Sequence, residues 1–330
     1  MGKLNLTLDY YWERRKDILI QRSSLPSMAG FDASIYANMG EMDNKGVDAN
    51  LEYQTRIGNK VGLRLFGNLT YSKNKIVFRD EPAMQYAYQK SEGTRYGEFY
   101  GYIAEGYFQS EEEIKKSPRQ MRELAPGDIK YKDLNDDGVI DANDQCYLGK
   151  SWFPSWSYGM GFNINYHNFD LALFFQGVSD VSIMANGGSI DTGNGDWGAS
   201  GVGIVPFTGM GLNPSNVITK ALDRWTADNP RADAWYPRMT ANATTNDNNY
   251  VNSTHWLKDG SYLRLKQASL GYTLENKKLM DKGIEYLYFY LSGQNLLTFS
   301  KFKLWDPELG SNGAKYPLSR MVTLGMRVSF

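Results

Sequence analysis

This 330-residue sequence has little cysteine, little histidine and almost no net charge, and each shortage excludes a class of function. The one cysteine, Cys146, rules out an intrachain disulfide and any metal cluster built from several cysteines. The two histidines, His167 and His255, stand far apart in the sequence and give little material for a zinc site or a catalytic triad. A net charge of -1 creates no field that would favour nucleic acid. We therefore predict no catalytic residues and no nucleic-acid partner.

Long hydrophobic runs are also missing. No run of about 18 apolar residues is present, so a transmembrane helix is excluded. The unbroken apolar segment of a signal peptide does not follow Lys3 either. Part of a transmembrane β-barrel would also lack long apolar runs, because only alternate residues of its strands face lipid. A soluble globular protein and a barrel segment are both compatible with these shortages.

The sequence does contain repeated alternation of apolar and polar residues, which is typical of β-strands with one apolar face. Eight segments show it, at about 4–10, 47–57, 61–71, 158–166, 169–177, 261–274, 284–298 and 322–330. In the sixth segment the apolar phase slips around Gln267, which predicts a β-bulge. The eight segments together predict an all-β fold with antiparallel strands.

The connections between these segments alternate between short and long. Short connections, "GNK", "HN" and "ENKKLMDKG", alternate with long ones at about 19–43, 77–155, 179–260 and 299–318. Outer-membrane barrels have this pattern, with short periplasmic turns and longer extracellular loops. Most segments span about 9 to 16 residues, more than the usual five or six of globular strands and enough to cross a membrane. The alternative is a soluble sheet with one buried face, the more common origin of alternating strands.

An acidic loop at 133–144, "DLNDDGVIDAND", has the residue spacing of an EF-hand calcium loop. Gly138 takes the tight-turn position, and Ile140 is expected to pack inward. The predicted oxygen ligands are Asp133, Asn135, Asp137, the Val139 carbonyl, Asp141 and Asp144. The last position is Asp where Glu is usual, and strand-like residues precede the loop where an EF-hand has a helix. Structural calcium is the favoured interpretation, and a solvated Asp/Asn/Gly turn is the alternative.

Several long stretches resemble the SusC/RagA-type family of TonB-dependent outer-membrane transporters, in the expected order over essentially the whole chain. They include "PGDIKYKDLNDDGVIDANDQ" (126–145), "YGMGFNINYHNFDLALFFQGV" (158–178), "WLKDGSYLRLKQASLGYTL" (256–274), "LYFYLSGQNLLTFSKFKLWDPE" (287–308) and the terminal "TLGMRVSF". The resemblance covers the C-terminal part of the family, so residues 1–330 are expected to lack the plug domain and signal peptide. It implies about eight strands of a transmembrane barrel of roughly 22 strands, with the four long connections as extracellular loops.

The resemblance also implies a function and partners. It implies an importer in the cell outer membrane that takes up glycans or peptides, with a SusD-like surface lipoprotein as a lid. Energy is expected to come from TonB through the missing N-terminal part, and outer-membrane lipid surrounds the strands. The terminal strand resembles the family's barrel-assembly signal through Val322, Leu324, Met326, Val328 and the final Phe330. The rival hypothesis is a soluble, calcium-braced β-domain that binds carbohydrate.

One further segment is predicted to be an extracellular loop. Residues 186–203 are rich in glycine but lack the lysine and Ser/Thr of a phosphate-binding loop. Trp197 within them is either a stacking platform for a sugar ring or a simple anchor. A short exposed helix is predicted at "EEEIKK" (111–116).

Overall fold

The structure is a computed structural model of the chain. It describes residues 3–25, 28, 30, 34–58, 60–121, 123–186, 219–239, 247–276, 280–281, 283–311, 313 and 316–330. Most of the predicted glycine-rich loop at 186–203, including Trp197, therefore lies outside the described residues.

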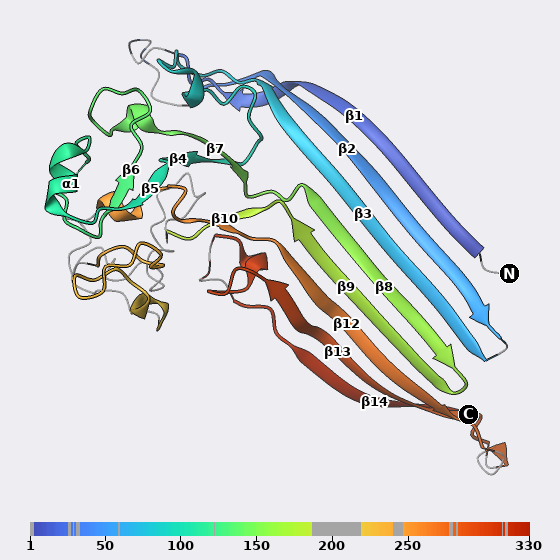
Figure 1. The fold of residues 1–330 in the computed structure, drawn as a ribbon. Helices are drawn as coiled ribbons and strands as arrows, with labels where there is room; N and C mark the ends of the chain where they lie inside the picture. The colour runs from blue at the N-terminus through green and yellow to red at the C-terminus, as the bar shows by residue number, and fades with distance from the viewer. Residues whose placement is uncertain are drawn as a thin grey trace.

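One antiparallel sheet of eight strands dominates the molecule (Figure 1). Its strands are β1 (Lys3–Gln21), β2 (Tyr36–Ile57), β3 (Val61–Phe78), β8 (Trp156–Tyr166), β9 (Phe169–Ser179), β12 (Tyr262–Leu274), β13 (Tyr286–Ser300) and β14 (Met321–Ser329). They are hydrogen-bonded in this order, so each strand pairs with the next one of the set along the chain. The prediction of eight long antiparallel strands is confirmed.

The bulge predicted near Gln267 is also present. The register of β12 shifts between Leu265 and Gln267 against both of its neighbours, so Lys266 is the extra residue. At the other end of the sheet, β1 and β2 continue further than their alternation predicts. They pair as far as Gln21 and Tyr36, which leaves a connection of 22–35 in place of the predicted 19–43.

Strand pairing collects the apolar side chains on one face of the sheet. Leu6 lies opposite Leu51 on the neighbouring strand, and Leu270 lies between Leu171 and Leu291. These side chains are open: Leu6 is 64% exposed and Leu270 is 49% exposed. Among the described residues no second layer covers this face, which Figure 1 shows as a single sheet. A continuous apolar surface of this size requires a non-aqueous neighbour.

The opposite face carries polar and charged side chains. Arg64 Nε lies 2.7 Å from Glu52 Oε1 across two strands, and the Tyr288 hydroxyl donates to Asp170 at 3.0 Å. The alternation in the sequence therefore separates an apolar face from a polar face, as a lipid-exposed sheet around an aqueous lumen requires.

The long connections gather at one end of the sheet and form a folded region, which we call the loop layer (Figure 1). It consists of the described parts of 79–155, 180–261 and 301–320. It contains strands β4 (Glu98–Gly101), β5 (Ala104–Tyr107), β6 (Ile129–Tyr131), β7 (Cys146–Ser151), β10 (Ser182–Met184) and β11 (Leu257–Asp259), helix α1 (Glu111–Lys116), and short 3-10 turns η2 (Ala87–Gln89), η3 (Ala142–Asp144), η5 (Thr219–Leu222), η7 (Asp247–Tyr250) and η8 (Pro307–Leu309).

The predicted short helix is α1, and none of its residues is buried. The Ser110 side chain caps it by accepting a hydrogen bond from the Glu113 amide. Within the part of the chain that the structure describes, no helix is long and apolar enough to cross a membrane.

Candidate functional site in the loop layer

The loop layer has a hydrophobic core of its own, built from two long connections. Ile129, Tyr131 and Ile140 from the first connection pack with Tyr236 and Trp256 from the second, and none of these is more than 1% exposed. Burying a large apolar side chain contributes about 1.5–3 kcal/mol. The two connections therefore form one folded unit, which holds most of the buried residues that the structure describes.

A buried polar network joins the same two connections. The Asp128 carboxylate is 1% exposed and accepts two hydrogen bonds from Arg238, at 3.0 and 2.9 Å, and one from the Asn249 amide at 2.8 Å. Beside it, the Gln120 amide nitrogen donates to the Asn248 side-chain oxygen at 2.8 Å. Buried polar groups paired across a junction in this way fix one relative arrangement of the two segments.

A glycine permits the close approach of the two connections beside Asp128. Gly127 has φ +92°, which disfavours any residue with a Cβ. A Cβ at this position would also lie 2.2 Å from a ring carbon of Trp225. The indole of the second connection thus packs directly on the backbone of the first.

The two histidines lie in different parts of the molecule. His167 is in the turn between β8 and β9, at the end of the sheet opposite the loop layer. His255 is in the loop layer, 3.4 Å from the Tyr107 hydroxyl and 3.2 Å from the Trp235 carbonyl oxygen. Burial, with the nearby Lys258 charge, lowers the pKa of His255 to about 4. His255 is therefore neutral at physiological pH.

Cys146 begins β7 and is buried. Burial raises the pKa of its thiol, so the thiolate that nucleophilic chemistry requires is disfavoured. Cys146 therefore serves as a small, buried hydrophobic residue.

The acidic loop at 133–144 is wrapped by hydrogen bonds between its own side chains and backbone. Asp133 Oδ2 accepts from the Gly138 amide at 2.8 Å, and Asn135 Oδ1 accepts from the Asp137 amide at 3.1 Å. Gly138 has φ +81°, as the tight turn requires. Ile140 is 1% exposed in the core, as its position in the motif predicts. The backbone therefore has the curvature that an oxygen-lined calcium loop needs.

The side chains of this loop differ in how they are engaged. Asp137 Oδ1 accepts from the Val139 amide at 2.9 Å, and the Asp144 oxygens accept from the Leu134 and Asp141 amides at 2.7 and 2.9 Å. Asp133 Oδ1, in contrast, is buried without a hydrogen-bond partner. Among the described residues no group of three His, Cys, Asp or Glu side chains is arranged to hold a metal ion. The carboxylates of Asp137, Asp141 and Asp144 are instead held by backbone amides of the loop itself.

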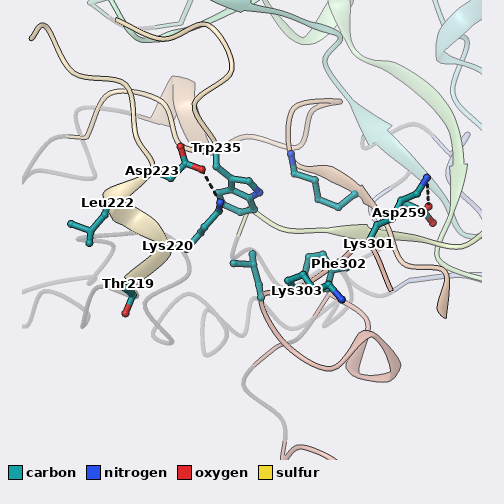
Figure 2. A pocket seen from close by; sticks show the side chains of 11 residues that line it. Thr219, Lys220, Leu222, Asp223, Trp235, Asp259, Lys301, Phe302 and Lys303 are labelled. Atoms are coloured by element: carbon teal, nitrogen blue, oxygen red, sulfur yellow. Dashed lines mark hydrogen bonds and ion pairs between the residues drawn. The ribbon is translucent and has the colours of Figure 1, made fainter. Parts of the chain in front are cut away.

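A cavity of about 780 Å³ opens in the loop layer between η5, β11 and the segment that follows β13 (Figure 2). Trp235 and Phe302 contribute aromatic rings to it, and Lys258 and Lys301 contribute ammonium groups. Nothing in the sequence points to this cavity, because its lining comes from four separate stretches of the chain: 219–223, Trp235, 258–259 and 301–304. The same is true of the Asp128 network.

The terminal strand β14 lies at the edge of the sheet, and β13 is its one partner among the described strands. The five residues of the proposed assembly signal alternate along it, and four of them are widely exposed: Val322 68%, Leu324 80%, Met326 58% and Phe330 83%. Its free edge is available for pairing with another strand.

No protein-family model matches the chain. Curated proteins do match it over 100% of its length. They include TonB-dependent receptor P3 and TonB-dependent receptor P26 of Formosa agariphila, at 27% and 28% identity, and TonB-dependent receptor SusC of Bacteroides thetaiotaomicron, at 22% identity. The chain covers 32%, 33% and 30% of these proteins, so it spans about a third of the length of the relatives it matches.

Solved structures give the same result for the fold. The RagAB peptide importer in its closed-closed state matches with a TM-score of 0.68 at 24% identity, over 99% of this chain and 33% of the matched chain. The open-open state matches with a TM-score of 0.69 at 23% identity, again over 99% and 33%. The predicted fold class, an antiparallel segment of a transmembrane β-barrel, is confirmed. So is the resemblance to the C-terminal part of a SusC/RagA-type TonB-dependent receptor, and these matches are to receptors and importers, not to enzymes.

Proposed function

We propose that this chain, as the C-terminal part of a SusC/RagA-type TonB-dependent receptor, forms the last strands and the extracellular loops of an outer-membrane importer for glycans or peptides. The observation that carries the proposal is the uncovered apolar face of the eight-stranded sheet, opposite a polar face. Lipid covers the apolar face, and the polar face lines a passage for solute.

The loop layer is the part of the chain that meets substrate and a lid. Its large, folded connections lie at one end of the sheet, where the extracellular loops of an outer-membrane barrel belong. A SusD-like lipoprotein would close over these loops, and TonB would supply energy through the parts of the whole receptor that residues 1–330 do not include. In this scheme Phe330 and the apolar residues of β14 serve as the barrel-assembly signal, since their side chains and strand edge are open.

Partitioning separates this proposal from its rival, a soluble calcium-braced domain that binds carbohydrate. We expect the protein to fractionate with outer membranes and to remain dispersed only in detergent or lipid, because its apolar face cannot be left in water. We also expect deletion of its gene to abolish growth on one class of oligosaccharide or peptide, with full recovery on re-expression. A monodisperse, detergent-free protein recovered from the soluble fraction would contradict the importer.

We also propose that the acidic loop holds a structural calcium ion. The support is the spacing of six oxygen donors, the tight turn at Gly138 and the buried, unpartnered Oδ1 of Asp133. Asp133, Asn135, Asp137, Asp141, Asp144 and the Val139 carbonyl would be its ligands. The ion would neutralise the acidic loop and brace it against the core that contains Ile140.

Calcium binding is tested by the double substitution Asp133→Ala/Asp137→Ala. We expect it to abolish the calcium-dependent heat in calorimetry, because two of the proposed carboxylate ligands are lost. Asp136→Asn is the matched control: Asp136 is exposed, lies between the ligand positions and has φ 58°, a conformation that asparagine tolerates. Equal binding by the double variant and the control would leave the solvated-turn interpretation standing.

A further inference from the structure

The cavity of Figure 2 carries more positive than negative charge. Four lysines line it, Lys220, Lys258, Lys301 and Lys303, against two aspartates, Asp223 and Asp259. Asp223 is already neutralised, because Lys220 Nζ lies 2.7 Å from it and Arg231 forms a second ion pair with it. Lys301 reaches Asp259 only at 3.9 Å, and the Lys301 side chain is 88% exposed. The cavity therefore has positive charge that its own carboxylates do not neutralise.

Lys258 holds the most unusual of these ammonium groups. Its Nζ lies 5.2 Å from the centre of the Trp235 ring and donates to the His255 carbonyl oxygen at 2.6 Å. Within the described part of the chain, no carboxylate lies at ion-pair distance from Lys258 or Lys303. Burial and the neighbouring Lys220 charge lower the pKa of Lys258. An anion placed in the cavity would oppose both effects and stabilise the protonated lysine.

The rest of the lining limits what such an anion can be. Trp235, Leu222 and Leu304 add apolar surface beside the lysines. Among the described lining residues there is no arginine, the residue suited to fixed bidentate contacts. A volume of about 780 Å³ suits a small molecule or a few linked units rather than the surface of a folded protein. Several anionic groups at close spacing, carried on units with an apolar side, would match both features.

We propose that this cavity binds an acidic oligosaccharide, a chain of sugars bearing carboxylate or sulfate groups. Each ring of such a chain carries its charge on a rigid frame, so several charges meet the lysines without the ordering of long side chains that an acidic peptide would need. The C–H faces of the rings pack on Trp235 and the neighbouring leucines. This inference rests on the proposed import function, for which it names the substrate class.

Binding is measured by calorimetry on the intact protein that carries this chain, purified in detergent, with hexameric oligogalacturonate as the probe. We expect maltohexaose, the neutral hexamer, to bind far more weakly, and oligogalacturonate binding to weaken as salt is raised. Lys301→Gln/Lys303→Gln should weaken oligogalacturonate binding about tenfold at low salt, because two of the four ammonium groups are removed. Both of these residues are exposed, so the variant should fold normally.

Lys115→Gln/Lys116→Gln is the matched control, since it removes the same charge from the exposed helix α1 in the same loop layer. Three results would each overturn the proposal. They are equal oligogalacturonate binding by the two double variants, equal affinity for maltohexaose and oligogalacturonate, and tighter binding of hexaglutamate than of oligogalacturonate. Uptake of the same oligosaccharides by cells is scored separately. Binding without uptake would contradict the importer and leave this site intact. Uptake that is unchanged in the Lys301→Gln/Lys303→Gln variant would contradict this site and leave the importer intact.

Discussion

Replacing Leu270 with arginine should destabilise the folded barrel by roughly 2–4 kcal/mol, the usual cost of a lipid-facing arginine deep in the membrane. Leu270 is in β12, in the interior of the sheet, and lies in one row with Leu171 and Leu291 on the apolar face. Leu270 is 49% exposed in the chain alone, so the change is costly only if a non-aqueous neighbour covers this face. In a soluble protein, arginine at an exposed position is nearly neutral.

Ser269→Arg is the control for this substitution. Ser269 is the preceding residue of the same strand and lies opposite Ala172 and Ser292, so its side chain projects to the polar face. We expect little loss of stability there, because an arginine can extend into water. The measurement is urea unfolding of the protein in lipid vesicles, followed by the mobility difference of folded and unfolded protein on gels. Similar losses in the two variants would show that the apolar face does not meet lipid.

The sheet could be predicted well because, within each strand, apolar residues face one environment and polar residues face the other, so the alternation is visible in a short stretch of sequence. Even the bulge at Lys266 was visible, since one extra residue reverses the phase of the apolar positions that follow. The same reasoning underestimated β1 and β2. Where they extend toward the loop layer, polar residues occupy both faces, as in "NMGEMDNKG", and pairs such as Arg14 with Glu41 replace apolar contacts. Strands that project beyond a membrane lose the alternation by which strands are recognised.

The loop layer was much less predictable, and the reason is sequence distance. Asp128 and Arg238 are 110 positions apart, and Gln120 and Asn248 are 128 apart. Neither pair belongs to a motif, because each contact depends on how two long connections pack. The acidic loop is the exception. Its spacing could be recognised because every proposed ligand falls within twelve consecutive residues, and its wrapping follows from local hydrogen bonds.

Replacing Asp128 with alanine should open the loop layer while the sheet stays folded. The substitution removes both hydrogen bonds to Arg238 and leaves the buried Asn249 amide and the Ala125 amide without their acceptors at this carboxylate. Breaking a buried, hydrogen-bonded charge pair by removing one partner costs about 3–5 kcal/mol. That loss is concentrated where two connections meet, so local opening of the loop layer should become far more frequent.

Hydrogen exchange of the intact protein in detergent resolves this effect by segment. We expect faster exchange in β6 and around Trp256, which share the core beside Asp128, and unchanged exchange in the central strands β8, β9 and β12. Asp233→Ala is the control, because Asp233 forms an ion pair with Arg231 in the same connection but its side chain is 86% exposed. Such a surface pair contributes about 0–1 kcal/mol, so exchange should barely change.

If the cavity binds its ligand only when the two connections are packed together, the Asp128 variant should also lose oligogalacturonate binding, although Asp128 is not part of the cavity lining. Retained binding with fast exchange would mean that the cavity is held together by its own contacts, independently of this network.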